Sequence, residues 1–332
     1  MLQCFLMPRL CEVLVILLCA PVQTLYSARP LLSLSKPFSR VSTGTWPGRI
    51  LALGDVHGDY NETLLLLRTA QIVDEKGHWR GGTSMLIQLG DLTDRGPQSR
   101  AVLRLFRRLR REARKAGGRC LMLMGNHEEM QLTGDFRYVH PEEKEEYGGG
   151  WKRTAAFQID GYEGSFLDSF DVGLIVNKTL FIHGGLHPES IAPDVYGKEN
   201  AIGRLNDDYR SFLYARLSRT GEVPMQLVQR FRGTHNPVWY RGNRVEERIT
   251  REALRGIGAV RMVVGHTPQV DGRIKTKWGG RLVLADTALS RWMPYPQGRP
   301  TLLELLPSGE LKELSLVKLD SDLVLVCRGL ES

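Results

Sequence analysis

The chain is poor in cysteine and has no long hydrophobic run. Only five of its 332 residues are cysteine, and Cys4, Cys11 and Cys19 lie within the first twenty positions. No CxxC pair is present, so neither a disulfide framework nor a cysteine-based zinc site is expected. The apolar run at 13–20 is too short for a membrane span. The chemistry of the protein must therefore rest on residues other than cysteine.

Internal repeats and low-complexity tracts are also absent. The composition, 42% hydrophobic and 25% charged, is ordinary for a globular protein with a sizeable core. The formal net charge of +8 suits an anionic substrate, a membrane surface or nucleic acid. Eight of the basic residues fall within 100–115, which predicts a helix with one basic face. A solvated surface is the favoured interpretation of that face, and a polyanion-binding surface is the alternative.

The first 48 residues are expected to be a leader and a linker. Arg9 precedes the apolar run at 13–20 and small residues follow, as is typical of a secretory signal. The same stretch is rich in serine with Glu12 as its only acidic residue, which also fits an organellar transit peptide. We expect a targeting segment at 1–28, a linker at 29–48 and no stable membrane span once the leader is removed. The secretory pathway is favoured, and a mitochondrion or plastid is the alternative.

From residue 49 onward, short apolar runs alternate with turns and amphipathic helices. Helices are expected at 61–72 and from Pro97 to about 115, and this alternation predicts an α/β fold with α+β character. Short connections between the strands at 282–285 and 302–306 favour mixed rather than purely parallel sheets. One domain is expected over 49–310, with inserted helical lobes at about 130–178 and 189–258 and a C-terminal tail at 311–332.

Five short motifs each come directly after an apolar, strand-like run. This placement brings Asp, His and Asn side chains to the ends of several strands, where water, metal ions and phosphate could be bound. The motifs are GDVHGD at 54–59, GDLTDRG at 90–96, GNHEE at 125–129, HGG at 183–185 and GHTP at 265–268.

The side chains in these motifs predict a centre for two divalent metal ions. Asp55 and His57 are two residues apart, so both project to one face of an extended strand end. Asp91 follows another strand, and its two carboxylate oxygens could bridge two ions. Nitrogen and oxygen ligands without thiolate suit manganese best, with iron or zinc possible. The expected ligands are Asp55, His57 and Asp91 for one ion and Asp91, Asn126, His183 and His266 for the other.

Two such ions generate hydroxide near neutral pH and hold phosphoryl oxygens during in-line attack. His127 is the expected general acid, and Asp94 would orient it and raise its pKa. Arg95 offers a bidentate fork to phosphate oxygens, and Asn126 is expected to contact the phosphate as well. The remaining histidines are interpreted as structural; they are His78, His140, His187 and His235.

At these residues the chain resembles the calcineurin-like metallophosphoesterase superfamily, over roughly 50–290. The DRG and NHE forms are similar to the phosphoprotein phosphatase branch. The WYRG run at 239–242 and the DTALS run at 286–290 are similar to its Shewanella-like, bacterial-type members. The resemblance implies a two-sheet β-sandwich flanked by helices, with the same six metal ligands, the same acid pair and Arg95 as a phosphate clamp. It also implies a second arginine, for which Arg241 is the candidate.

The resemblance implies a phosphatase for phosphomonoesters, with phosphoserine, phosphothreonine or phosphotyrosine in proteins as the expected substrates. A polyphosphatase or a dinucleoside polyphosphate hydrolase with the same site is the alternative. A polyanion- or membrane-binding module with a vestigial site is the competing non-enzymatic hypothesis. The chain lacks the SAPNY segment and toxin-binding loop of eukaryotic cytosolic phosphatases. No regulatory subunit is therefore expected. The expected partner is a phosphorylated protein or a small phosphate ester, and no specific nucleic acid is expected.

Overall fold

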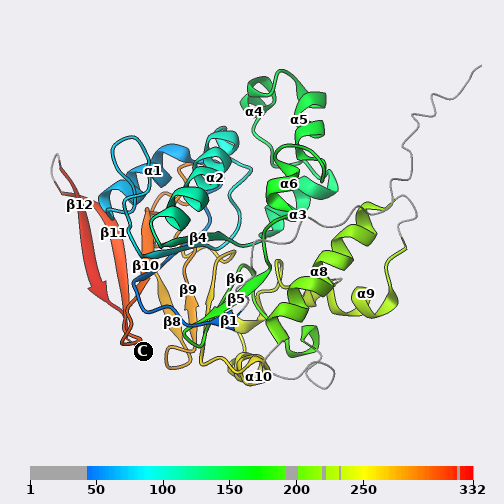
Figure 1. Ribbon diagram of the computed structural model, residues 1–332. Coiled ribbons are helices and arrows are strands. Elements are labelled where there is room, and N and C mark those ends of the chain that lie inside the picture. The colour runs from blue at the N-terminus through cyan, green and yellow to red at the C-terminus, as the bar shows by residue number, and fades with distance from the viewer. Residues whose placement is uncertain (1–42, 192–200, 219–221, 232, 320–321, 332) are drawn as a thin grey trace, which may run out of the picture. The chain divides into compact units, whose positions relative to one another are not determined.

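Two six-stranded β-sheets form the centre of the computed structural model (Figure 1). The structure describes residues 43–191, 201–218, 222–231, 233–319 and 322–331. The expected targeting segment at 1–28 lies outside these residues. The expected location in the secretory pathway or an organelle, which depends on that segment, therefore stays a prediction. No helix in the described ranges is long and apolar enough to cross a membrane.

The first sheet carries three of the five motifs on neighbouring parallel strands. Strands β2, β3 and β4 pair in parallel, and β10, β11 and β12 extend the sheet from β2 in antiparallel fashion. Since parallel strands end at the same edge, the loops after β2, β3 and β4 lie together. In spatial order the strands are β12 (Asp322–Gly329), β11 (Leu311–Leu319), β10 (Thr301–Leu305), β2 (Ile50–Leu53), β3 (Met85–Gln88) and β4 (Arg119–Met122).

The second sheet carries the other two motifs. Strands β6, β7 and β9 are parallel, whereas β5 and β8 pair antiparallel with β6 and β9. The mixed pairing expected from the short late connections is confirmed in both sheets. In spatial order the strands are β1 (Thr43–Gly44), β5 (Gly173–Val176), β6 (Thr179–Ile182), β7 (Arg261–Val264), β9 (Leu282–Leu284) and β8 (Lys275–Lys277).

Side-chain alternation along the strands explains how both faces of each sheet are buried. Ile50 and Ala52 of β2 join the cluster between the two sheets, together with Phe181 of β6. The intervening residues Leu51 and Leu53 join the other cluster, which contains the helices. Each fully buried aliphatic or aromatic side chain contributes about 1.5–3 kcal/mol. The expected sandwich flanked by helices is therefore confirmed.

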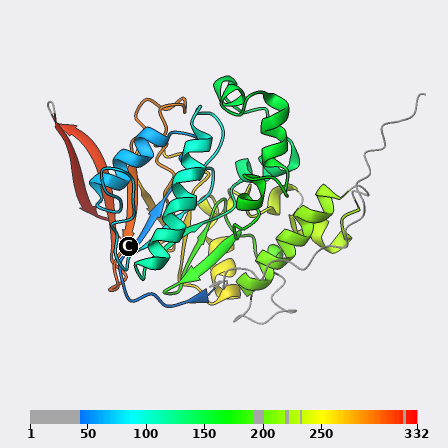
Figure 2. The same cartoon turned by 45° about the horizontal axis from the view of Figure 1, so that its top comes forward.

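Helix α2 (Ser99–Lys115) covers the first sheet beside α1 (Tyr60–Thr69), as both views show (Figures 1 and 2). It begins two residues after the expected Pro97. Its basic face is only partly solvated, because several arginines bind the neighbouring lobe. Arg100 donates to the Glu146 carbonyl, Arg107 binds the buried Glu163, and Arg110 donates to Ser169. These arginines fix α2 to residues 140–170.

Two groups of helices interrupt the strands, close to the expected insertions. Strand β5 lies within the range expected to be a helical lobe, because Gly173–Val176 pairs with β6. The first group is α3 (Asn126–Thr133), α4 (Pro141–Glu146), α5 (Gly150–Phe157) and α6 (Gly164–Leu167). The second is α8 (Ala201–Leu217), α9 (Met225–Phe231) and α10 (Glu247–Ile257), with short 3₁₀ turns that include η1 (Pro188–Ser190) and η3 (Gly233–His235).

The C-terminal segment differs from the expected tail. Strands β11 and β12 pair with each other in antiparallel fashion, and β11 pairs with β10 over five residues (Figure 1). Leu311, Leu314 and Leu316 are buried, so the strand is held by packing as well as by backbone hydrogen bonds. Strands β11 and β12 therefore continue the first sheet beyond residue 310.

Candidate metal centre and active site

Backbone hydrogen bonds draw the motif loops of the two sheets together. The Val56 and His57 amides both donate to the Asp91 carbonyl, which joins the first two motifs. The His266 amide donates to the Asp55 carboxylate at 3.1 and 3.2 Å, which joins the first motif to the last. The carboxyl ends of parallel strands from both sheets thus meet at one place.

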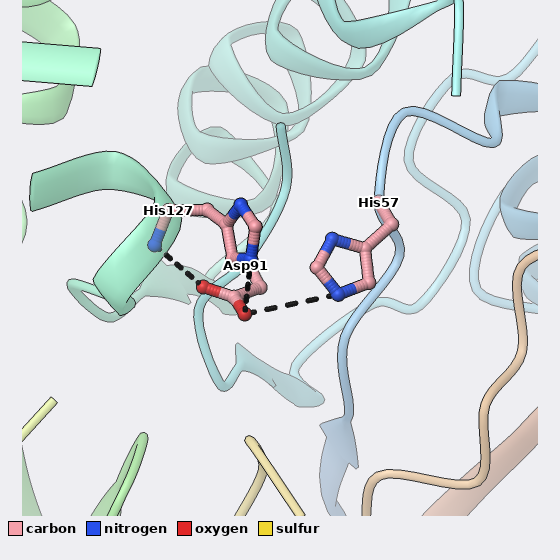
Figure 3. Close-up of side chains that lie close together, drawn as sticks. All are labelled: His57, Asp91 and His127. Atoms are coloured by element: carbon pink, nitrogen blue, oxygen red, sulfur yellow. Dashed lines mark hydrogen bonds and ion pairs between the residues drawn. The ribbon is translucent and has the colours of Figure 1, made fainter. Parts of the chain in front are cut away.

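Asp91 lies at the centre of the converging side chains. Figure 3 shows its carboxylate between the imidazoles of His57 and His127. Its Oδ2 lies 3.8 Å from His57 Nε2, and its Oδ1 lies 3.3 Å from His183 Nε2. Asn126 Oδ1 is 3.0 Å from the same nitrogen of His183. The two oxygens of Asp91 therefore face two different sets of side chains, as expected of a bridging ligand.

Two groups of potential ligand atoms share Asp91. Within each group the atoms lie within 4.8 Å of one another, and every member is buried. Asp55 stands 3.9 Å from both His57 and His183. The grouping also places His127 beside the first set. The groups are His57, Asp91 and His127, and Asp91, His183 and His266.

The residues present fit a pair of cations. A Cβ on Gly125 would clash with the Asp91 carboxylate, and one on Gly265 would clash with that of Asp55, so glycine is required at both positions. One carboxylate oxygen of Asp286 is buried without a hydrogen-bond partner among the described residues. Buried carboxylates without a donor call for a proton or a metal ion. The donor set of carboxylate, amide oxygen and imidazole suits divalent metals.

The protonation preferences of the site agree with this fit. Burial raises the pKa of Asp55 well above its ordinary value, assisted by the charges of Asp286 and Asp91. Burial likewise raises the pKa of Asp286 to about 6. Burial lowers the pKa of His57 to about 3 and that of His266 to about 2, so both imidazoles are neutral. Neutral imidazole is the form that binds a metal.

Five of the expected site residues adopt a backbone conformation that is uncommon for residues other than glycine. Positive φ values of this kind are tolerated only where surrounding contacts enforce them, and they gather at functional sites. The strain therefore marks the motif loops as a functional region. The residues are His57 (φ 43°), Asp91 (φ 58°), Asp94 (φ 70°), Arg95 (φ 67°) and His266 (φ 59°).

His127 and Asp94, the expected acid pair, are in direct contact. His127 Nδ1 lies 2.7 Å from Asp94 Oδ2, and both side chains are buried. Burial alone would lower the pKa of His127, but Asp91 and Asp94 together raise it. Gln131 donates to the other oxygen of Asp94 at 2.7 Å and so fixes the carboxylate. The imidazole is therefore held in one orientation and favours its protonated form.

Glu128 is a site residue that the motifs alone did not single out. Its carboxylate accepts hydrogen bonds from the amides of Asp91, Leu92 and Thr93 at 2.7–3.3 Å, and also from the amide of Gly125. It therefore holds the second motif in its strained conformation against the third. The sequence signal that could have found it is its position directly after His127 in GNHEE.

Both expected arginines lie near the centre. The Arg95 guanidinium stacks over the Tyr138 ring at 4.8 Å, and its Nε is buried without a partner in the described part of the chain. Arg241 donates to the His266 carbonyl at 2.9 Å. Burial lowers the pKa of Arg241, whereas the charge of Asp55 raises it, which places the guanidinium close to the carboxylates.

Three aromatic side chains to which the sequence assigned no role lie near the histidines of the site. Tyr138 packs against His127, Trp239 lies edge-on to His266, and Trp292 contacts the His140 ring. Each of the three is about 40% exposed. No spacing in the sequence joins them, since they come from three separate loops. They form an aromatic rim, which is the name used below for Tyr138, Trp239 and Trp292.

This combination of a two-sheet sandwich and an Asp–His–Asn centre with an adjacent acid pair defines a metallophosphatase. The family model described as calcineurin-like phosphoesterase matches residues 48–270, and the chain belongs to that family. The expected resemblance is thereby confirmed, and the non-enzymatic hypothesis loses its basis.

Individual relatives agree with this assignment. A protein of Schizosaccharomyces pombe without an assigned function is 34% identical, over 74% of each chain. Shewanella-like protein phosphatase 2 of Arabidopsis thaliana is 28% identical, over 78% of this chain and 75% of the relative. The crystal structure of a cold-active protein-tyrosine phosphatase from a psychrophilic Shewanella species is 28% identical, with a TM-score of 0.69, over 82% of this chain and 80% of that one.

Proposed function

We propose that the protein is a dinuclear metal-dependent phosphomonoesterase that acts on phosphorylated proteins. The observation that carries this proposal is the position of Asp91, whose two oxygens face two separate groups of imidazoles. The ligand assignment made from the sequence supports it, with Asp55, His57, Asp91, Asn126, His183 and His266 as the proposed ligands.

The residues around this centre would then divide the work of ester hydrolysis. His127 would donate its proton to the leaving oxygen, and Asp94 would keep that proton on the imidazole until transfer. Arg95 and Arg241 would bind the phosphate oxygens, because guanidinium offers paired donors to that geometry. Two bound divalent ions would lower the pKa of a water molecule and withdraw charge from the phosphoryl group.

The aromatic rim supports a phosphoprotein substrate and favours phosphotyrosine. Tyr138 packs against His127, Trp239 against His266 and Trp292 against His140, and these half-exposed rings offer stacking surface for an aromatic leaving group. Such ring pairs contribute about 0.5–1.5 kcal/mol beyond area burial. The relatives named as phosphatases include both a general protein phosphatase and a protein-tyrosine phosphatase. We therefore propose phosphotyrosine first and phosphoserine or phosphothreonine second.

The test uses the full chain loaded with manganese. It should hydrolyse p-nitrophenyl phosphate and lose that activity with a chelator. A panel of matched phosphotyrosine, phosphoserine, polyphosphate and diadenosine tetraphosphate substrates then separates the substrate hypotheses. A metal-replete enzyme that turns over no phosphomonoester would overturn the proposal. Faster turnover of polyphosphate than of any phosphopeptide would favour the alternative activity.

The arginines of α2 do not favour the alternative activity on polyphosphate or dinucleoside polyphosphates. Arg100, Arg107 and Arg110, which suggested a polyanion track, donate to groups of the lobe at 140–170. A polyanion would have to displace these contacts before it could bind there.

Manganese is our proposal for the native metal pair, and a location outside the cytosol is our proposal for the protein. Nitrogen and oxygen ligands without thiolate support the first, although supply in the compartment also decides which metal is bound. The composition of residues 1–48 supports the second. Metal analysis of protein purified from its native source tests the proposal of manganese. Imaging of a C-terminal fluorescent fusion tests the proposed location.

A further inference from the structure

A second group of potential metal ligands lies outside the motif loops. His187, Glu189 and His235 bring one ligand atom each to within 4.8 Å of one another. His235 Nδ1 is 3.2 Å from the Glu189 carboxylate. His187 and His235 stack with ring centroids 3.9 Å apart and planes within 4° of parallel. Two imidazoles and a carboxylate from distant parts of the chain therefore meet.

The ion pair between His235 and Glu189 does not explain why a second imidazole, that of His187, lies against His235. The exposed His78–Glu112 pair, with Nδ1 and Oε1 2.9 Å apart, shows a histidine and a glutamate paired without a second imidazole. At the second group, Glu189 accounts for His235 in the same way. The parallel His187 is additional, and its hydrogen bond to the described residues is a long one, in which Nδ1 accepts from the Glu189 amide at 3.3 Å.

The proximity and chemistry of these three side chains suit a borderline divalent ion. Their ligand atoms lie within 4.8 Å of one another, and an ion that binds both nitrogens at about 2.0–2.1 Å would draw them to about 3.3 Å. The lone pair of each nitrogen lies in its ring plane, so one of the two parallel rings would turn to bind the ion. Burial lowers the pKa of His187, and the neighbouring His235 lowers it further, so this ring is neutral and able to bind a metal. Two histidines and a glutamate also form the ligand set of known zinc centres, with a fourth position left to water.

We propose that His187, Glu189 and His235 form a third cation site that takes a zinc ion, separate from the centre around Asp91. The site joins η1, which follows the HGG motif, to η3, which precedes the WYRG run. Ser190 already donates to the His235 carbonyl at 2.8 Å, so the two segments are in register before any ion binds.

An ion at this site would affect the segment that carries Arg241. The His187 ring packs edge-on against Tyr240, with centroids 5.5 Å apart, and the Gly184 and Gly185 amides donate to the Pro237 carbonyl. Zinc would therefore fix residues 233–241 against the HGG loop and stabilise that part of the second lobe. The inference concerns metal binding and stability, so it stands or falls independently of the phosphatase activity.

The test counts metal in the full chain. Protein saturated with manganese is transferred to buffer that contains zinc and no manganese, then desalted and analysed for both metals by mass spectrometry. The manganese that is lost measures exchange at the Asp91 centre, and zinc in excess of that loss is counted as additional. We expect one zinc per chain beyond that exchange, and loss of this zinc in Glu189→Gln and in His235→Gln. The expected fall in zinc affinity is more than about 100-fold, since even indirect partners of a metal ligand account for 10–100-fold.

The matched control is His78→Gln, which removes a histidine from an exposed His–Glu pair and should retain the additional zinc. Circular dichroism and the melting temperature with manganese alone verify that the variants fold. Zinc should raise the melting temperature of the wild type and of His78→Gln but not of the two site variants. Equal zinc content in wild type and site variants would overturn the proposal, as would zinc-edge anomalous diffraction with no peak at His187.

Discussion

The motif loops and the inserted lobes are held in different ways. The loops follow strands directly, and backbone amides fix them over short distances, as where Glu128 binds the amides of Asp91 and Leu92. The lobes attach mainly through side chains, several of them buried. Glu129 on α3 accepts from Tyr209 and Arg216 of α8 and from Asn236, and so connects the second lobe to the metal centre.

The first lobe is joined to the acid pair by a buried chain of polar contacts. Gln131 donates to Asp94 and accepts from Arg153 at 2.8 Å, and Arg153 in turn binds Glu143. Arg153 and Glu143 are 2% and 0% exposed. The comparison teaches that the proposed ligands lie on loops fixed by backbone amides, whereas the orientation of Asp94 beside His127 depends on contacts with the lobe.

Asp91→Asn should have the largest effect, because it removes the proposed bridging charge from both metal groups. We expect kcat to fall by at least about 10³-fold, consistent with a metal contribution of several kcal/mol. Metal content should fall at the same time. Metal analysis and steady-state kinetics at saturating manganese check this, and full activity with both metals retained would contradict the bridging role.

His127→Asn should lower kcat by about 10²–10⁴-fold while leaving the metal content unchanged. The reason is that the His127 imidazole is proposed to donate a proton to the leaving oxygen and not to bind a metal ion. The loss should be smaller with p-nitrophenyl phosphate than with phosphoserine, since a better leaving group needs less protonation. Loss of metal in this variant would instead make His127 a ligand, as its place beside His57 and Asp91 allows.

Arg153→Met should act on stability more than on chemistry. It leaves the buried Glu143 without its cation, and breaking a buried pair costs about 3–5 kcal/mol. Burial already raises the pKa of Glu143, with Arg153 opposing the rise. A raised native pKa means stability that is present at low pH and lost as pH rises. The variant's deficit, measured by urea unfolding, should therefore shrink on acidification.

The control for this variant is the double change Arg153→Met with Glu143→Leu. Two apolar side chains of similar size avoid the uncompensated charge, so most of the stability should return. If the single variant is as stable as the wild type at neutral pH, the buried pair does not hold the lobe.

Arg241→Lys should lower kcat/KM by about tenfold, because lysine is a point charge without the paired donors of guanidinium. The matched control is Arg248→Lys, an exposed arginine that pairs with Glu246 and Glu252. Steady-state kinetics on one phosphopeptide compare the two. An equal response of both variants would remove Arg241 from the phosphate site.

Trp292→Ala should have the smallest effect and should change selectivity rather than rate. Loss of about 1 kcal/mol of ring stacking corresponds to a several-fold fall in kcat/KM for phosphotyrosine peptides. Turnover of the matched phosphoserine peptide should stay nearly constant. An equal fall for both peptides would mean that the aromatic rim supports the loop and does not select the substrate.

Local pattern was sufficient to predict much of the fold. Strands β2 and β6 end directly before the GDVHGD and HGG motifs, as expected. Helix α1 differs from its expected range by one residue at the start and three at the end, and α2 begins two residues late. The pair formed by β11 and β12 was missed because LKELSLVKL at 311–319 has no motif and finds its place only by pairing with β10 and β12. Likewise, Gly173–Val176 could not be separated from the surrounding helices by pattern alone.

The sequence by itself determined which residues make up the proposed centre, because each motif couples a strand end to the side chains that it presents. Asp55, Asp91 and His127 can be identified from the motifs alone. Only the tertiary structure decided what surrounds them: Asp286 against Asp55, Glu143 behind Asp94, and the aromatic rim. These contacts join residues far apart in the chain, and their free energy arises from burial and charge in the folded state, which no local spacing encodes.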